Sequence, residues 1–111
     1  MAGNIYTHLF RAIGYTEYLS IINTSRFSLR PNGLEAKYFG MSFKETLDFA
    51  NKVFNIHVVA IVETTIDEQI LSEIGDFTLV DVTVFKSGTV EIDKIHLDRF
   101  NNSITGIKHI Y

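Results

Sequence analysis

The sequence predicts a single α+β domain in which two to three short helices pack on a mixed, mostly antiparallel sheet. The chain has 111 residues, of which 46% are hydrophobic and 13% aromatic, and this suits one domain with its own core. Strand-like and helix-like hydrophobic periods alternate along the chain. No linker-like stretch, low-complexity tract or internal repeat interrupts it, so we expect residues 1–111 to form one unit.

The chain begins with a predicted strand followed by a helix. Residues 5–13 are rich in strand formers, and the alternation of a strand places Arg11 on the same face as two aliphatic side chains. A glycine then ends the strand. A short helix is predicted over residues 16–23, with Leu19 and Ile22 on its buried side.

A basic loop separates this helix from the next strand. Periodicity disappears over residues 25–36, and the Pro-Asn-Gly turn at 31–33 indicates a long loop. Residues 37–41 are predicted to form a short strand. Ser42 and Glu45 then have the spacing of a capping box, in which each side chain bonds to the backbone of the other. The helix that follows carries an apolar stripe at helical spacing, formed by Phe43, Leu47, Ala50 and Phe54.

The second half of the chain is predicted to be mainly strand. Residues 56–66 are apolar on both faces, which indicates a strand inside the sheet. A short helix is predicted over 67–74, closed by Gly75. Residues 77–85 and 89–97 are predicted to pair as a hairpin. The C-terminal tail follows no clear pattern.

Composition excludes several classes of function. Ten Lys and Arg residues against thirteen Asp and Glu residues argue against general nucleic-acid binding, which requires phosphate charges to be neutralised. The chain has no cysteine, and its four histidines lack the spacing of a metal site, so we expect no metal centre. Neither a secretory signal nor a stretch long enough to cross a bilayer is present, so we expect action in the cytoplasm and no membrane insertion.

Several segments of the first half together resemble a known family. They are Phe10-Arg11-Ala12-Ile13, Arg26-Phe27, the stretch from Pro31 to Phe39 and the helix that contains Ala50. This pattern is similar to compact ADP-ribosyltransferase-like domains, which occur at the C-termini of bacterial polymorphic toxins. The resemblance implies a toxin or effector domain that uses NAD, and it implies a possible cognate immunity protein as a partner.

The resemblance also implies a mechanism. Such enzymes bind NAD in a cleft and break its nicotinamide–ribose bond, so positive charge develops on the ribose in the transition state. A carboxylate near that carbon stabilises the transition state more than the ground state. The residues that would bind NAD by this resemblance are Arg11 on the first strand and, along the cleft wall, Asn32, Lys37, Tyr38 and Phe39.

The catalytic acid has three candidates. The resemblance favours Glu63, near the end of a buried strand, or Glu35 in the basic loop, and Glu91 is a third choice. Ser42 is predicted to support the acid, although its capping role also explains its presence. The Glu-x-Glu pair of arginine-modifying transferases is absent. The acceptor therefore stays open among protein, nucleic acid and water, and water would make the activity an NAD glycohydrolase.

Two other functions fit the sequence. A small ribonuclease toxin would use general acid–base catalysis by His8 or His57 together with Glu63 or Lys37. A non-enzymatic protein-binding module would instead offer an exposed sheet edge, for example near residues 77–97.

Overall fold

Six strands form one antiparallel sheet, and four helices pack on it, in a computed structural model that describes residues 5–28, 36–52, 60–78 and 83–111. The strands are β1 (Tyr6–Ile13), β2 (Ala36–Gly40), β3 (Ala60–Asp67), β4 (Asp76–Thr78), β5 (Thr89–Asp93) and β6 (Ile104–His109). The helices are α1 (Tyr15–Thr24), α2 (Phe43–Lys52), α3 (Glu68–Ile74) and α4 (Leu97–Ser103). The predicted α+β class is confirmed, but each pairing of the described strands is antiparallel, and there is one helix more than expected.

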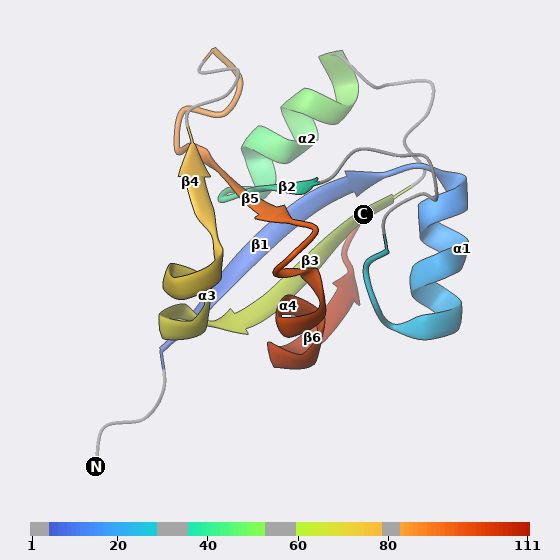
Figure 1. The fold of residues 1–111 in the computed structure, drawn as a ribbon. Coiled ribbons are helices and arrows are strands. Elements are labelled where there is room, and N and C mark those ends of the chain that lie inside the picture. Colours follow the sequence, from blue (N-terminus) through green and yellow to red (C-terminus); the bar gives the residue numbers. More distant parts are fainter. Residues whose placement is uncertain (1–4, 29–35, 53–59, 79–82) are drawn as a thin grey trace.

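The strand order is β4-β5-β2-β1-β3-β6 (Figure 1). Neighbouring strands differ in the number of positions at which they pair. β1 and β3 are in register at eight positions, from Tyr6 opposite Asp67 to Ile13 opposite Ala60. In contrast, β1 and β2 are in register at one position, where Phe10 faces Gly40. The sheet therefore consists of two halves that diverge between β1 and β2.

The helices lie on both sides of the sheet (Figure 1). Leu9 and Ile13 of β1 point to one side, here called the core face, where they belong to one apolar cluster with residues of α1, α3 and α4. Neighbouring strand residues point to the other side, here called the α2 face. On the α2 face the ring of Phe10 meets the ring of Phe43 at 6.2 Å. A Cβ atom at Gly40 would clash with Thr46 Oγ1 of α2, so α2 packs directly on the backbone of β2.

Helix α1 exists where the sequence predicts a helix, but its buried side differs. Ile21 is buried, whereas Leu19 and Ile22 are 39% and 56% exposed, so the prediction for these two residues is wrong. Tyr18 instead packs against the core together with Ile21, three positions along the helix. The apolar residues of this helix are spread around its circumference, so spacing alone did not identify the buried side.

Capping side chains are present at the N-termini of α2 and α3. The amide of Glu45 donates to Ser42 Oγ at 3.3 Å, as the predicted cap requires. The reciprocal contact of the capping box is replaced, because the Glu45 carboxylate accepts from the amide and hydroxyl of Ser87. Asp67 caps α3 by accepting from two backbone amides, and Gly75 follows its last residue, so the predicted helix is confirmed.

The predicted hairpin is shorter than expected. β4 and β5 pair antiparallel, and the turn before β5 contains Gly88 with a φ of 86°, a conformation that favours glycine. The predicted second strand, 89–97, ends at Asp93, because a turn leads there into α4. β3 lies between β1 and β6, as expected for an inner strand, while residues 56–59 lie outside the described part of the chain.

Asn101 of α4 fixes the segment that follows α1. Its side-chain oxygen accepts from the amide of Phe27 at 2.8 Å, and its side-chain nitrogen donates to the carbonyl of the same residue at 2.8 Å. The ring of Phe27 is thereby held against those of Phe39 and Phe100 in the core. Among the described helices, none is both long enough and apolar enough to span a bilayer.

Candidate functional site

Arg11 lies where the two halves of the sheet diverge. Its Nε and Nη2 atoms donate to the carboxylate of Glu17 in α1 at 2.7 and 3.0 Å. Its Nη1 atom donates to the backbone carbonyl of Tyr38 in β2 at 2.8 Å, beyond the one position at which β1 and β2 pair. The guanidinium also lies 5.9 Å from the centre of the Phe39 ring. One half-buried side chain therefore joins β1, β2 and α1.

Glu17 is the centre of a small ionic cluster. Lys37 of β2 brings its Nζ atom to 3.4 Å from the Glu17 carboxylate, and the three side chains are between 10% and 22% exposed. Burial alone would raise the pKa of Glu17, but the hydrogen bonds and charges of Arg11, followed by those of Lys37, outweigh it and lower that pKa below its ordinary value. The carboxylate is therefore ionised at neutral pH.

Sequence reasoning did not identify Glu17. An acidic residue in the first turn of a helix has a sufficient explanation in the helix dipole. The signal that could have found it is Arg11 itself, since a cation on the core side of a strand requires a partner when it is buried. Glu17 lies six residues later, and the chain reverses direction between β1 and α1. The first turn of α1 therefore lies beside β1, where Glu17 bonds to Arg11.

A second pair of polar side chains lies on the α2 face. Tyr38 is opposite Glu91 in the β2–β5 register, and its side chain is accessible to solvent. Burial, and then a hydrogen bond to the Glu91 carboxylate, raise the pKa of the Tyr38 hydroxyl above its ordinary value. Tyr38 therefore contacts Arg11 through its carbonyl and Glu91 through its hydroxyl.

The structure does not bring Arg11 and Glu63 together. Val62 is the residue opposite Arg11 in the β1–β3 register, and Glu63 is opposite Phe10, so Glu63 points to the α2 face. There it lies 4.0 Å from Nδ1 of His8, which is also 3.1 Å from the hydroxyl of Thr65. Glu63 thus belongs to a partly exposed histidine–carboxylate pair on the α2 face of the sheet.

The other predicted site residues divide between core and surface. Phe39 is buried between two other phenylalanine rings, so it forms part of the core, and Tyr38 is the exposed member of the adjacent aromatic pair. The Ser42 hydroxyl caps α2. Asn32 and Glu35 lie outside the described residues.

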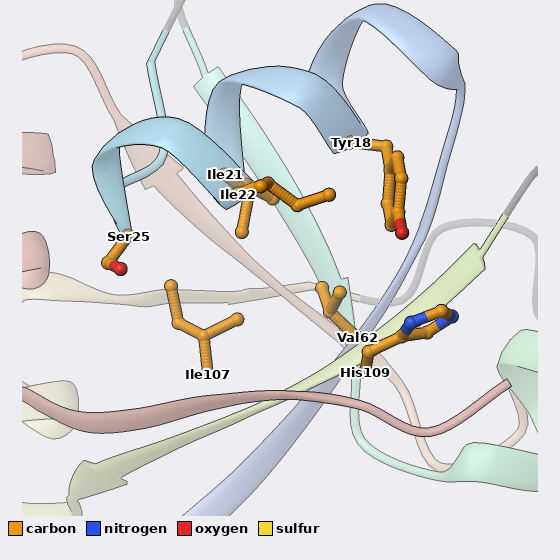
Figure 2. A pocket seen from close by; sticks show the side chains of 7 residues that line it. All are labelled: Tyr18, Ile21, Ile22, Ser25, Val62, Ile107 and His109. Carbon is orange, nitrogen blue, oxygen red and sulfur yellow. The ribbon is translucent and has the colours of Figure 1, made fainter.

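A pocket of about 310 Å³ opens between α1 and the β3–β6 side of the sheet (Figure 2). The residues that line it are Tyr18, Ile21, Ile22 and Ser25 from α1 and its C-terminal cap, and Val62, Ile107 and His109 from the two strands. The pocket is on the core face, the same face as the Arg11 side chain, because Val62 and Arg11 are cross-strand neighbours.

Comparison with known proteins adds no assignment. No family model, no curated protein and no solved structure matches the chain. Within the described residues, no group of three or more His, Asp or Glu side chains is gathered so as to hold a metal ion.

We predict that Glu17→Gln destabilises the protein in a pH-dependent way. Because the folded-state pKa of Glu17 is lowered, its ion pairs stabilise the fold above the ordinary pKa of 4.5, and this contribution is lost as the pH falls through the folded-state pKa. At pH 7 the variant should lose about 1–3 kcal/mol of unfolding free energy, measured by urea denaturation. At pH 3 the difference from the natural sequence should be smaller than at pH 7, because protonation of Glu17 removes its ion pairs.

Glu73→Gln is the matched control, because Glu73 forms an exposed ion pair with Arg99. This control should change the unfolding free energy by less than about 1 kcal/mol. A Glu17→Gln effect of the same size at both pH values would contradict the ionic explanation.

Proposed function

We propose that the chain is an NAD-dependent ADP-ribosyltransferase or NAD glycohydrolase in which Arg11 binds the dinucleotide. One observation carries the proposal. An arginine side chain has five N–H donors, and three of those of Arg11 bond to Glu17 and Tyr38. Two donors have no acceptor among the described residues, although the side chain is held in place from three directions. Such a guanidinium is pre-organised for a phosphate or a ribose hydroxyl.

The charge around Arg11 supports an anionic ligand. Within the described residues, two cationic side chains, Arg11 and Lys37, meet one carboxylate, Glu17. Restricted exposure strengthens the attraction between such a site and a pyrophosphate group. The ionised Glu17 keeps the two cations in place before the ligand arrives.

Glu91 is the preferred acid for this reaction. The bond between nicotinamide and ribose breaks as nicotinamide leaves with the bonding pair, and positive charge develops on the ribose. Tyr38 links Arg11 to Glu91, since it contacts the first with its carbonyl and the second with its hydroxyl. Glu63 lies on the same α2 face as Glu91, but it is opposite Phe10 and beside His8 and has no such link to Arg11. Glu35 stays a candidate outside the described residues.

The acceptor completes the reaction. A nucleophile, water or a macromolecular side group, forms the new bond to the ribose carbon and releases one proton to solvent. With water the products are nicotinamide, ADP-ribose and a proton, so the balance requires no further reactant. The absence of a Glu-x-Glu pair argues against arginine side chains as acceptors and favours water or another nucleophile.

Arg11→Ala should abolish dinucleotide binding without unfolding the protein. The expected result is at least about a tenfold increase in the Kd for NAD by calorimetry, because a charge-assisted bidentate contact is lost. Arg11→Lys should recover only part of the affinity, since lysine does not reproduce the planar fork. Arg99→Ala, at an exposed arginine paired with Glu73, is the control and should leave the Kd unchanged. Equal NAD affinity in Arg11→Ala and the natural protein would contradict the assignment.

Glu91→Gln should lower the rate of nicotinamide release by about 100-fold or more, because the developing charge on the ribose loses its counter-charge. The measurement is nicotinamide formation from NAD, followed chromatographically at saturating dinucleotide. Glu63→Gln is the matched control and should retain activity. A loss of activity in Glu63→Gln or Glu35→Gln, with Glu91→Gln active, would move the acid to that residue.

A second candidate function has its own structural support. The pairing of His8 with Glu63 at 4.0 Å, on the α2 face of the sheet, fits the acid–base ribonuclease that the sequence also suggests. RNA degradation by the natural protein, lost in His8→Ala and unaffected by Arg11→Ala, would favour this function over NAD chemistry. Nicotinamide release without RNA degradation would favour the transferase or glycohydrolase.

A further inference from the structure

The pocket between α1 and β6 has an aliphatic body and an aromatic end (Figure 2). Ile21 and Ile22 approach it from the helix, and Val62 and Ile107 approach it from the strands. Because α1 does not cover this part of the sheet completely, Ile22 keeps an exposed fraction of 56%. A volume of about 310 Å³ is at the lower end of the range for ligand sites, which suits a single ring system rather than an extended molecule.

The aromatic end of the pocket presents a hydrogen-bond acceptor. Tyr18 and His109 pack edge to face, with ring centres 5.6 Å apart. Nε2 of His109 lies 3.0 Å from the backbone carbonyl of Tyr111, and a carbonyl oxygen only accepts. In the neutral ring, Nε2 therefore carries the proton and Nδ1 keeps a free lone pair. Figure 2 shows this ring beside Tyr18 at one end of the pocket.

The chemistry of the lining selects a neutral, planar ligand. Its seven residues include no Asp, Glu, Lys or Arg. A pocket without a carboxylate gives no compensation for the desolvation of a cationic ring such as the pyridinium of NAD. A neutral heteroaromatic ring with an amino donor satisfies both the apolar walls and the acceptor at His109 Nδ1.

The pocket adjoins the cluster around Arg11. Val62 in its floor is directly opposite Arg11 in the β1–β3 register, and Tyr18 follows Glu17 in α1. Side chains of directly opposite strand residues are separated by about 5 Å. Arg11 and the pocket therefore share the core face of the sheet on neighbouring strands, and the guanidinium itself extends toward Tyr38 of β2.

We propose that this pocket binds the adenine ring of an adenine nucleotide, with its exocyclic amino group donating to Nδ1 of His109. The part of the inference that links adenine to NAD rests on the proposed function, in which Arg11 binds the anionic part of the dinucleotide. The assignment of the ring site itself rests on the pocket.

Titration with adenosine, which has no phosphate, tests the ring site by itself. The readout is the amide NMR spectrum of the complete chain, with the Kd taken from the shifts of residues 104–109. Ile22→Asp puts a charge at the mouth of the pocket and should weaken adenosine binding at least tenfold. Leu19→Asp is the matched control, because Leu19 is an exposed aliphatic residue of the same helix that does not line the pocket, and it should leave the Kd unchanged.

His109→Phe tests the hydrogen bond. It keeps an aromatic ring beside Tyr18 and removes the acceptor, so adenosine should bind at least threefold more weakly, while purine without the amino group should bind the variant and the natural protein equally. Equal adenosine affinity in the natural protein, Ile22→Asp and His109→Phe would overturn the proposal. Absence of any adenosine shift at residues 104–109 would also overturn it.

The two proposals fail separately. If adenosine binds as predicted, but no nicotinamide is released from NAD, the ring site stands and the proposed function fails. If nicotinamide is released at a rate and with a KM that Ile22→Asp does not change, the proposed function stands and the ring site is overturned.

Discussion

The guanidinium of Arg11 joins parts of the molecule that the backbone leaves separate. β1 and β2 share one position in register, so the two halves of the sheet lack a continuous ladder at this boundary. The side chain of Arg11 supplies the missing connection, with one bond to the Tyr38 carbonyl and two to the Glu17 carboxylate. A half-buried cation would be costly at this position without these partners. The placement of α1, the opening of the sheet and the candidate site therefore depend on the same ionic cluster.

This arrangement reconciles a structural and a functional role for one residue. A saturated arginine only stabilises a fold, and an unbraced one binds ligands at the cost of ordering its own side chain. Arg11 is intermediate, since Glu17 and Tyr38 hold it while two donors are left without an acceptor among the described residues. The pocket beside Val62 lies on the same core face as Arg11, and its lining is mainly apolar and carries no charged carboxylate, lysine or arginine. A cationic site next to an uncharged ring site is the combination that a nucleotide requires.

Local signals predicted those parts of the fold that local interactions determine. Asp67 caps the beginning of α3 and Gly75 marks its end, and both bond to backbone groups only a few residues away. The pairing of β4 with β5 was likewise predicted from the turn that precedes β5. Helix α4 was missed because residues 89–97 are rich in β-branched residues, although the alternation of apolar residues breaks at Lys94. Side-chain and backbone bonds between Asp93 and His96 turn the chain at that point. The buried side of α1 was assigned wrongly because apolar and aromatic residues occur all around it, and contact with the sheet, a long-range interaction, decides among them. Arg11 was identified as a site residue, but its partner Glu17 was not, since strand register and helix placement determine which carboxylate a cation reaches.

The most direct test of this account observes the Arg11 side chain itself. In a ¹⁵N-labelled sample, the Nε–H resonance of Arg11, assigned by its loss in Arg11→Lys, reports both the bond to Glu17 and any contact with a ligand. We expect a resonance protected from solvent exchange in the free protein, which shifts on titration with NAD or ADP-ribose and loses its protection in Glu17→Gln. A resonance that NAD leaves unchanged, at concentrations where other signals of the protein shift, would show that the dinucleotide binds elsewhere and would contradict the account.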